Sequence, residues 1–442
     1  MDTADLIIKA KYVITMSNPM VIEDGAVAIG DGVIKAVGKA DDVLRAYRAE
    51  EVLDRGRHIL MPSLIDAHTH TQQVFLKSFI NDDRLSLPPI WTKLLIPFEE
   101  LLDSELAYLS ALLSVAAMAK NGVTMFIEAA SPKPHELIKA VREVGIRAVV
   151  TPSTFNVRDG EVLDYKDVIH RIEELLPEAD DRVRVWCSVR QIMMSTEDLL
   201  LSIKDFCLKH GLGITYHMGE YQGEVDYSLT KYGKRPLEVL DELGLTRIRP
   251  TVIAHGVYLS SKERAIVRER GLGIAWCPTT DSIVMGLHWL PLFDGYVFGI
   301  GSDGGAFTTL DLLHEARVAR AVGKALLVAT TYDKSSLSTQ VLLKALTGWG
   351  GELVGDGVGV IGEGYRADVI TLSVNDLRVL PIHDPLEAVV TMLDGHNVSD
   401  VLVGGDFVVR DGRLVGVDEG SLIERVLDVL PVVRDKLSRV DV

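Results

Sequence analysis

The feature that most constrains the fold is a regular alternation of short apolar runs and longer helix-like segments between residues 61 and 360. The runs are rich in β-branched residues, and the segments between them carry apolar residues at helical spacing, which is the pattern of βα units. Eight parallel strands with intervening helices predict an α/β fold of the (β/α)8 TIM-barrel type, with its chemistry at the carboxyl ends of the strands. The predicted strands are Leu64–His70, Val123–Glu128, Arg147–Thr151, Val183–Val189, Gly213–Gly219, Thr251–His255, Gly273–Pro278 and Val297–Asp303.

Both ends of the chain have a different pattern, of short alternating runs broken by turn signals and without crossover helices. Because edge strands prefer to be paired, we expect the two ends to meet in one small β-sandwich beside the barrel. An outer helix is expected over Ser421–Leu437. The predicted domains are therefore residues 1–60 plus 361–442 for the sandwich and residues 61–360 for the barrel.

The charge and hydropathy of the sequence argue against some classes of binding partner. The 442 residues carry a net charge of -17 and contain no basic block, which argues against nucleic acid and against an anionic membrane surface. Residues Met1–Ala10 do not have the pattern of a signal peptide, and apolar stretches such as Leu109–Ala119 are too short to cross a bilayer. We therefore expect a cytoplasmic protein that acts on a small molecule, and we also expect it to be a homo-oligomer.

The three cysteines also fit the expectation of a cytoplasmic protein. Cys187, Cys207 and Cys277 are an odd number with wide spacings and without a CxxC pair. Such spacing predicts neither a disulfide framework nor a thiolate zinc site.

The segment His68-Thr69-His70 closes the first predicted strand. Residues i and i+2 of a strand point to the same side of the sheet, so the two imidazoles can converge on one metal ion. On its own this pair is a weak signal, because two exposed histidines near a strand end are common. The remaining ligands have to come from equivalent positions on other strands.

Three other strands also end in groups that can bind a metal ion. The fifth strand ends at His217, with Glu220 three residues further on, the sixth ends at His255, and the eighth ends at Asp303. A single such residue would usually be an ordinary loop residue. Because the carboxyl ends of parallel strands meet on one rim of a barrel, however, the joint placement of these groups with the histidine pair predicts a metal site.

This set of motifs resembles the amidohydrolase superfamily. Within it, the chain is similar to the branch that holds guanine deaminases, cytosine deaminases, methylthioadenosine/S-adenosylhomocysteine deaminases and triazine chlorohydrolases, and the resemblance runs from end to end. The motifs that carry it are His68-Thr69-His70 after Pro-Ser-Leu-Ile-Asp-Ala, His217-x-x-Glu220, an isolated His255, Cys277-Pro278, Ser302-Asp303-Gly304, and the Gly-x-x-Ala-Asp segment at Gly364 to Asp368.

The resemblance implies one divalent metal ion, bound by His68, His70, His217 and Asp303, with zinc expected and iron as the alternative. Binuclear members bridge two metals with a modified lysine at the end of the fourth strand, and Trp186–Arg190 contains no lysine. Three nitrogen donors and one carboxylate leave a position for water, and a metal lowers the pKa of that water to about 7.

The implied reaction is hydrolytic deamination of an amino-substituted nitrogen heterocycle, with a purine base or nucleoside first. A metal-bound hydroxide attacks a ring carbon and ammonia leaves. Glu220 would accept the proton of the water and return it as general acid and base. His255 would hold the attacking water or the developing charge, and Asp303 would share the proton transfer while it ligates the metal.

Partial matches to members of this branch suggest which residues contact the substrate. Gln73 stands three residues after the histidine pair, where guanine deaminases and triazine chlorohydrolases carry a glutamine. Glu99 is similar to the acid that grips ribose hydroxyls in nucleoside deaminases, and Arg190 lies near the ring-binding arginine of guanine deaminases. His255 is also expected to touch the substrate, and the long segment Val74–Pro97 is expected to cover the pocket as a lid.

Two other functions stay open. The segments after Pro278 and Gly304 depart from the usual pattern of the family, so the same site could instead act as a chlorohydrolase or N-dealkylating aminohydrolase of triazine-type rings. An alternative of another class is a catalytically silent barrel that binds ligands or assembles oligomers. Such descendants usually lose metal ligands, whereas this chain keeps all of them.

Overall fold

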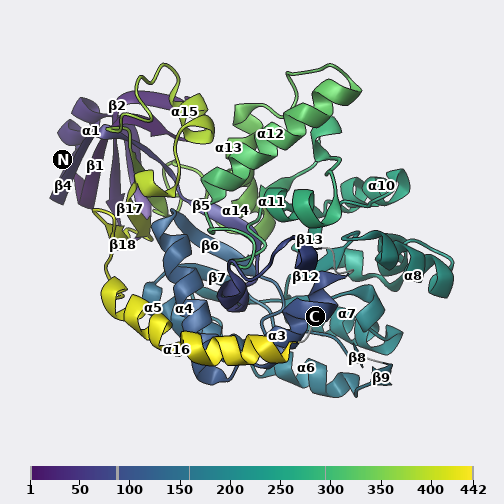
Figure 1. Cartoon of the computed structure of the whole chain (residues 1–442). Helices are drawn as coiled ribbons and strands as arrows, with labels where there is room; N and C mark the ends of the chain where they lie inside the picture. The colour runs from purple at the N-terminus through teal and green to yellow at the C-terminus, as the bar shows by residue number, and fades with distance from the viewer. Residues whose placement is uncertain (1, 86–88, 159, 294, 441–442) are drawn as a thin grey trace.

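The computed structural model describes residues 2–85, 89–158, 160–293 and 295–440 (Figure 1). Seven of the eight runs predicted as strands in the middle of the chain form one strand each and the fourth forms two, which confirms an α/β fold with parallel strands. The strands are β5 (Leu64–Thr69), β6 (Val123–Glu128), β7 (Arg147–Val150), β10 (Val183–Val185), β11 (Cys187–Val189), β12 (Ile214–Met218), β13 (Thr251–His255), β14 (Gly273–Trp276) and β15 (Phe298–Ile300).

These strands lie in two parallel sheets, with the orders β10-β7-β6-β5 and β11-β12-β13-β14-β15. The fourth predicted run is divided at Trp186, whose N–H donates to the last residue of β7 at 3.1 Å, whereas the N–H of Cys187 donates to the residue before β12 at 3.0 Å. At the other edge the N–H of Asp303 donates to the carbonyl of His68 at 2.9 Å. The continuous chain through Trp186 therefore joins the two sheets at one edge, and a backbone hydrogen bond joins them at the other.

Helices connect the strands and cover the outside of the two sheets (Figure 1). Their ends follow local capping rules: α7 begins after Thr196, whose side chain accepts the N–H of Leu199, and ends at Gly211 with φ of 65°. The connecting helices are α4 (Ser104–Lys120), α5 (Pro134–Val144), α6 (Tyr165–Glu173), α7 (Glu197–His210), α8 (Gln222–Tyr232), α9 (Pro236–Leu243), α10 (Ser261–Arg270), α12 (Leu312–Thr330), α13 (Thr339–Leu346) and α14 (Gly348–Val354).

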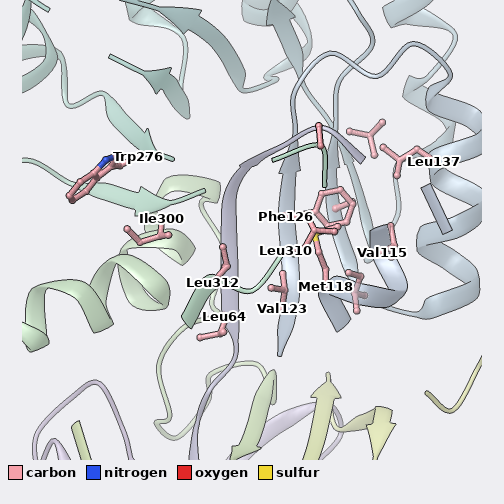
Figure 2. Close-up of a cluster of buried hydrophobic side chains, with 14 of the residues drawn as sticks. Leu64, Val115, Met118, Val123, Phe126, Leu137, Trp276, Ile300, Leu310 and Leu312 are labelled. Atoms are coloured by element: carbon pink, nitrogen blue, oxygen red, sulfur yellow. The ribbon is translucent and has the colours of Figure 1, made fainter. Parts of the chain in front are cut away.

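The core between helices and strands is apolar and closed to solvent. Figure 2 shows Val115 and Met118 of α4 beside Val123 and Phe126 of β6, and all four side chains are fully buried. Burying apolar surface stabilises the folded chain by about 25 cal/mol per Å². This packing fixes the helix layer against β6, and β6 in turn pairs with β5, which carries the histidine motif.

The two ends of the chain meet in one sheet, as predicted. Its order is β19-β18-β17-β16-β4-β1-β2-β3, and β4 pairs with β1 on one side and with β16 on the other. The predicted sandwich is not seen as two separate sheets, because the long β4 joins the strands of both ends into one. The strands are β1 (Asp2–Ile14), β2 (Val21–Gly30), β3 (Val33–Lys39), β4 (Tyr47–Pro62), β16 (Val369–Ser373), β17 (Val398–Val403), β18 (Asp406–Arg410) and β19 (Arg413–Leu414).

The outer C-terminal helix is α16 (Glu419–Arg439), which crosses α4 and is tied to it by the ion pair of Lys120 and Glu419 at 2.6 Å (Figure 1). No single helix of the described chain is long and apolar enough to span a membrane; one pair, Trp91–Glu100 with Ser104–Lys120, passes by length and composition but is bent by 114°. The shorter elements are α1 (Ala40–Ala46), α2 (Asp82–Leu85), α3 (Ile96–Glu100), α11 (Pro278–Thr280), α15 (Pro385–Thr391), β8 (Val157–Arg158) and β9 (Glu161–Val162).

The cysteine prediction was wrong in one respect. Cys187 of β11 and Cys207 of α7 form a disulfide, with their Cα atoms 6.6 Å apart, while Cys277 is free and buried. The two residues are separated by 20 positions in the sequence, and only the packing of α7 against β11 brings them together. Spacing alone could not reveal that contact.

Candidate metal and catalytic site

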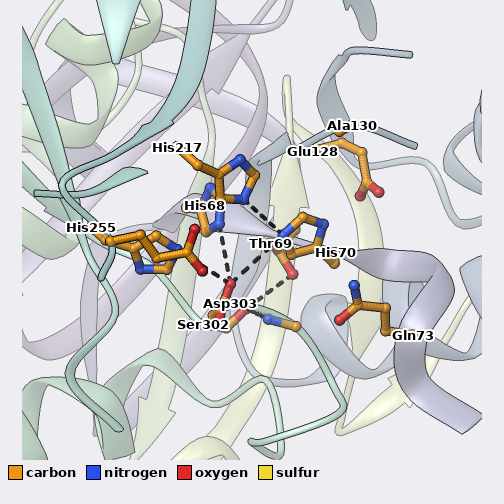
Figure 3. Close-up of polar contacts among 12 residues, drawn as sticks. His68, Thr69, His70, Gln73, Glu128, Ala130, His217, His255, Ser302 and Asp303 are labelled. Atoms are coloured by element: carbon orange, nitrogen blue, oxygen red, sulfur yellow. Dashed lines mark hydrogen bonds and ion pairs between the residues drawn. The ribbon is translucent and has the colours of Figure 1, made fainter. Parts of the chain in front are cut away.

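The five metal-compatible residues predicted from the sequence meet at the carboxyl ends of four strands (Figure 3). Nε2 of His68 lies 3.1 Å from Oδ1 of Asp303, and Nε2 of His70 lies 3.7 Å from the same oxygen. His217 faces His70 with the two Nε2 atoms 3.2 Å apart, and Nε2 of His255 is 3.9 Å from Asp303 Oδ1. All five side chains are buried. The convergence predicted from strand ends is therefore present in the fold.

The spacing of these atoms suits a metal ion. Two groups could hold one, His68 with His70 and His217, and His68 with His255 and Asp303, and the ligand atoms of each group lie within 4.8 Å of one another. Two imidazole nitrogens bound to one tetrahedral zinc at ~2.0–2.1 Å would be roughly 3.4 Å apart. The 3.2 Å between His70 and His217 is close to that separation.

Protonation separates His255 from the other three histidines. Burial holds the pKa values of His68, His70 and His217 well below the ordinary value of 6.5, so these imidazoles are neutral and can donate a lone pair. Burial is the largest single influence on the pKa of His255 and acts in the same direction. The hydrogen bond from its Nδ1 to Asp281 at 2.8 Å, together with the negative charges of Asp281, Asp303 and Glu220, outweighs burial and raises the pKa of His255 to about 10. His255 therefore behaves as a positively charged group beside the neutral ligands.

The backbone around the site is held in unusual conformations. His255 and Asp303 both have positive φ, 66° and 56°, which costs a residue other than glycine ~1–3 kcal/mol and persists only where the surroundings enforce it. Gly304, with φ of 100°, packs on His70 so closely that a Cβ atom would lie 2.7 Å from the His70 carbonyl oxygen. The strand ends are thus fixed in the conformations that direct the ligands inward.

A buried carboxylate joins the first and last strands of the site. Asp66 accepts hydrogen bonds from the Ser302 N–H at 3.0 Å, the Ser302 hydroxyl at 2.6 Å and the His68 N–H at 3.2 Å. Ser302 precedes Asp303 in the chain, so Asp66 sets the position of one metal-ligand candidate relative to another.

Glu220 lies in the pocket of the metal residues, as predicted. Burial raises the pKa of this carboxyl to about 7. Its Oε2 accepts a hydrogen bond from the side-chain amide of Gln191, and its backbone N–H donates to Glu224 at 3.0 Å. A carboxyl group with a pKa near neutrality is suited to accept and return a proton.

Of the four residues predicted to contact the substrate, two line the pocket and two do not. Gln73 donates to Glu99 at 2.6 Å, and Glu99 accepts two hydrogen bonds from Arg190 at 3.1 and 3.2 Å, so the three residues form one buried cluster. Arg190 and His255 line the pocket, whereas Gln73 and Glu99 are not among its described lining residues. Gln73 stands to the side of the histidines in Figure 3. Glu99 instead borders a separate cavity of about 490 Å³.

The pocket itself is nearly closed in this conformation, with a volume of about 20 Å³. That volume admits about one water molecule and no heterocycle. Ile90, Trp91 and Leu95 cover one side, and these residues belong to the predicted lid segment 74–97, of which residues 86–88 lie outside the described chain. Substrate entry therefore requires this cover to move.

Two polar residues of the site were missed by the sequence analysis. Gln191 contacts Glu220, and Asp281 contacts His255. Both are fully buried, and both follow residues that were noticed, Gln191 after Arg190 and Asp281 after the Cys277-Pro278 pair. A polar residue within five positions of a strand end was the available signal, but its partner could not be read from the sequence.

Comparison with known proteins places the chain among hydrolases. The model of the amidohydrolase family matches residues 59–408. A 5-methylthioadenosine/S-adenosylhomocysteine deaminase of Acetivibrio thermocellus is 28% identical over 432 residues, which cover 96% of this chain and 98% of the relative. The enzyme of the same name from Nitratidesulfovibrio vulgaris is 29% identical over 429 residues, 96% of each chain.

Solved structures show the same fold. An adenosine deaminase of Xanthomonas campestris with bound zinc is similar with a TM-score of 0.89 and 24% identity, covering 99% of each chain. The zinc complex of an atrazine chlorohydrolase from Arthrobacter aurescens has a TM-score of 0.85 and 20% identity, covering 96% of this chain and all (100%) of that one.

Proposed function

Since this chain belongs to the amidohydrolase family, we propose that it is a metal-dependent deaminase of amino-substituted purines, with nucleosides such as 5-methylthioadenosine first. The observation that carries the proposal is the buried cluster of three neutral histidines and Asp303 with Glu220 in the same pocket. The enzyme is a hydrolase that acts on carbon–nitrogen bonds other than peptide bonds. The names of the relatives support the nucleoside as the first substrate to test.

The reaction balances with water as the only co-substrate. The water oxygen bonds to the trigonal ring carbon, the bond from that carbon to the amino nitrogen breaks, and ammonia leaves. One water proton goes to the ring nitrogen and the other to the leaving amine. A divalent metal held by His68, His70, His217 and Asp303 would supply the lowered pKa of the water, to about 7.

Glu220 moves the protons in this scheme. Its Oε2 is occupied by the amide of Gln191, and no described residue bonds its Oε1. The free oxygen can therefore take a proton from water and deliver it to the ring nitrogen. His255 lines the same pocket as a charged donor, fixed by Asp281, and would stabilise negative charge that develops on the attacking oxygen.

The choice of metal and the finer architecture are also proposals. Three nitrogen donors and a carboxylate favour zinc, with iron as the alternative, and the zinc in two similar structures supports that choice. We propose that the parallel sheets close into one (β/α)8 barrel, residues 61–360, supported by the continuous chain through Trp186 at one edge and by the hydrogen bond from Asp303 to His68 at the other. We also propose that the sheet of residues 1–60 and 361–442 curls into a sandwich, supported by the bond from Ile34 in β3 to Tyr365, just before β16.

Location and assembly are proposals that rest on other features. The acidic composition and the small-molecule site support a cytoplasmic enzyme without nucleic-acid or membrane partners. A homo-oligomer is supported by the exposed apolar residues Ile423, Leu427 and Val432 on α16. Light scattering on the purified protein would test the assembly.

The test of function is a panel assay. Zinc-loaded protein would be assayed for ammonia release from 5-methylthioadenosine, S-adenosylhomocysteine, adenosine, guanine, cytosine and melamine, with chloride release from a chlorotriazine in parallel. We expect ammonia release from at least one purine. This activity should be lost when a chelator removes the metal and should return when zinc is added. Chloride release without ammonia release would favour the chlorohydrolase, and a purified protein that binds no metal would favour the silent barrel.

A further inference from the structure

Gln191 lies in the catalytic pocket, where its side-chain N–H holds Glu220, but its amide oxygen has no role in the reaction scheme above. It lies two residues beyond the end of β11, is 1% exposed, and lines the pocket together with His217, Glu220 and Asp303. Its two amide atoms have different surroundings. Nε2 donates to Glu220, whereas Oε1 is buried without a hydrogen-bond partner among the described residues.

A buried amide oxygen without a partner is costly, because it has lost water and gained nothing in return. Such an atom in a binding pocket is typically completed by the ligand. An amide oxygen only accepts hydrogen bonds, so the group that completes it has to carry a hydrogen on nitrogen or oxygen.

The other side-chain oxygens discussed for the pocket either have another role or do not distinguish a hydrogen-bond donor from an acceptor. Asp303 is placed among the histidines, and the free Oε1 of Glu220 is the one needed to move protons. Oγ1 of Thr280, which is also buried without a partner, can donate as well as accept and so does not discriminate between the two kinds of group. Oε1 of Gln191 is thus the acceptor-only group that remains for the substrate.

We propose that Gln191 selects the leaving group: its Oε1 accepts an N–H of the amino group that departs as ammonia, while its Nε2 holds Glu220 in place. A chlorine atom at the same carbon has no hydrogen to offer and would place its lone pairs against the amide oxygen. The substrate class is therefore an amino-substituted ring and not its chloro counterpart. This inference rests on the proposed deaminase function and answers the question of the leaving group that the sequence left open.

The test compares two pairs of compounds that differ only in the leaving group: adenosine with 6-chloropurine riboside, and melamine with 2-chloro-4,6-diaminotriazine. Ammonia or chloride release gives kcat/KM for each compound, and calorimetry gives its affinity for the zinc-loaded protein. The measured quantity is the amino-to-chloro ratio in wild type, Gln191→Leu and Gln191→Met. Ammonia needs a proton to leave whereas chloride does not, so a loss of Glu220 positioning can lower the ratio of kcat/KM values. The ratio of affinities does not include that proton transfer and therefore carries the test.

We expect the ratio to fall roughly 10- to 100-fold in both variants, in turnover and in affinity. The matched control is Gln72→Leu, since Gln72 is equally buried but has its amide bonded to Ser131 and Lys133, outside the pocket lining, and should leave the ratio unchanged. Wild type that releases ammonia with a ratio that Gln191→Leu and Gln191→Met do not alter would overturn the inference and keep the proposed function. Wild type that releases no ammonia from any purine of the panel, or that acts only on the chloro compounds, would overturn both.

Discussion

Replacing Glu220 by glutamine is the sharpest perturbation of this site. The change keeps the shape of the side chain and removes its ability to carry a proton. Glu220 belongs to neither group of residues that could hold the metal, so metal binding should survive. The amide of Gln191 can rotate to offer its oxygen to the new amide, so the local packing is also expected to remain.

The expected loss follows from the role of the group. A positioned general acid and base contributes about 10²- to 10⁴-fold to the rate, which corresponds to roughly 3–5 kcal/mol of transition-state stabilisation. The pH profile should carry the same signature. Burial raises the pKa of Glu220 to about 7, so the wild-type carboxyl becomes protonated, and kcat/KM falls, as the pH drops through a range well above the ordinary value of 4.5. Glu220→Gln should lose that acidic limb.

The assay combines ammonia release between pH 5 and 9 with the metal content of the purified variant. Glu128→Gln is the matched control, because Glu128 is also a buried acid at a strand end, with a pKa raised by burial to about 8, but it binds the Thr71 N–H and is not among the pocket lining. We expect less than a 10-fold loss in this control. A Glu220→Gln protein with bound metal and wild-type activity would refute the proton-transfer role.

Three further perturbations test the ion pairs and the disulfide of the fold. Glu99→Ala leaves Arg190 as an unpaired buried charge and should lower the free energy of unfolding in urea by ~3–5 kcal/mol, whereas equal stability would contradict the ion pair. Reduction should remove ~3 kcal/mol by the loop-entropy estimate, since the Cys187–Cys207 disulfide closes a loop of 20 residues, and a melting temperature unchanged by dithiothreitol would argue against the bond. Hydrogen bonds from Arg147 and then Arg366 lower the pKa of Asp181 from 3.8 to about 2, so this group stabilises the fold above the unfolded value and loses that effect as the pH falls toward 2. The stability gap between wild type and Asp181→Asn should therefore narrow from pH 5 to pH 3, and a constant gap would show that the pKa is not shifted.

Much of the site followed from two regularities of the sequence. Alternation along a strand puts His68 and His70 on one side of the sheet, and parallel strands bring their carboxyl ends together whatever the loops between them do. His217, His255 and Asp303 could therefore be placed beside the histidine pair from their positions at strand ends. The repeated βα pattern likewise determined the parallel strands.

Only the tertiary structure decided which side chains pair with the site residues and with one another across separate elements. Gln191 on Glu220, Asp281 on His255, and the disulfide of Cys187 are contacts between separate elements, and no spacing in the sequence encodes them. They depend on loop conformation and on the angle at which each helix packs, which are set by the whole core. The same holds for the 20 Å³ pocket, because its volume is what remains after the side chains of distant segments have packed together.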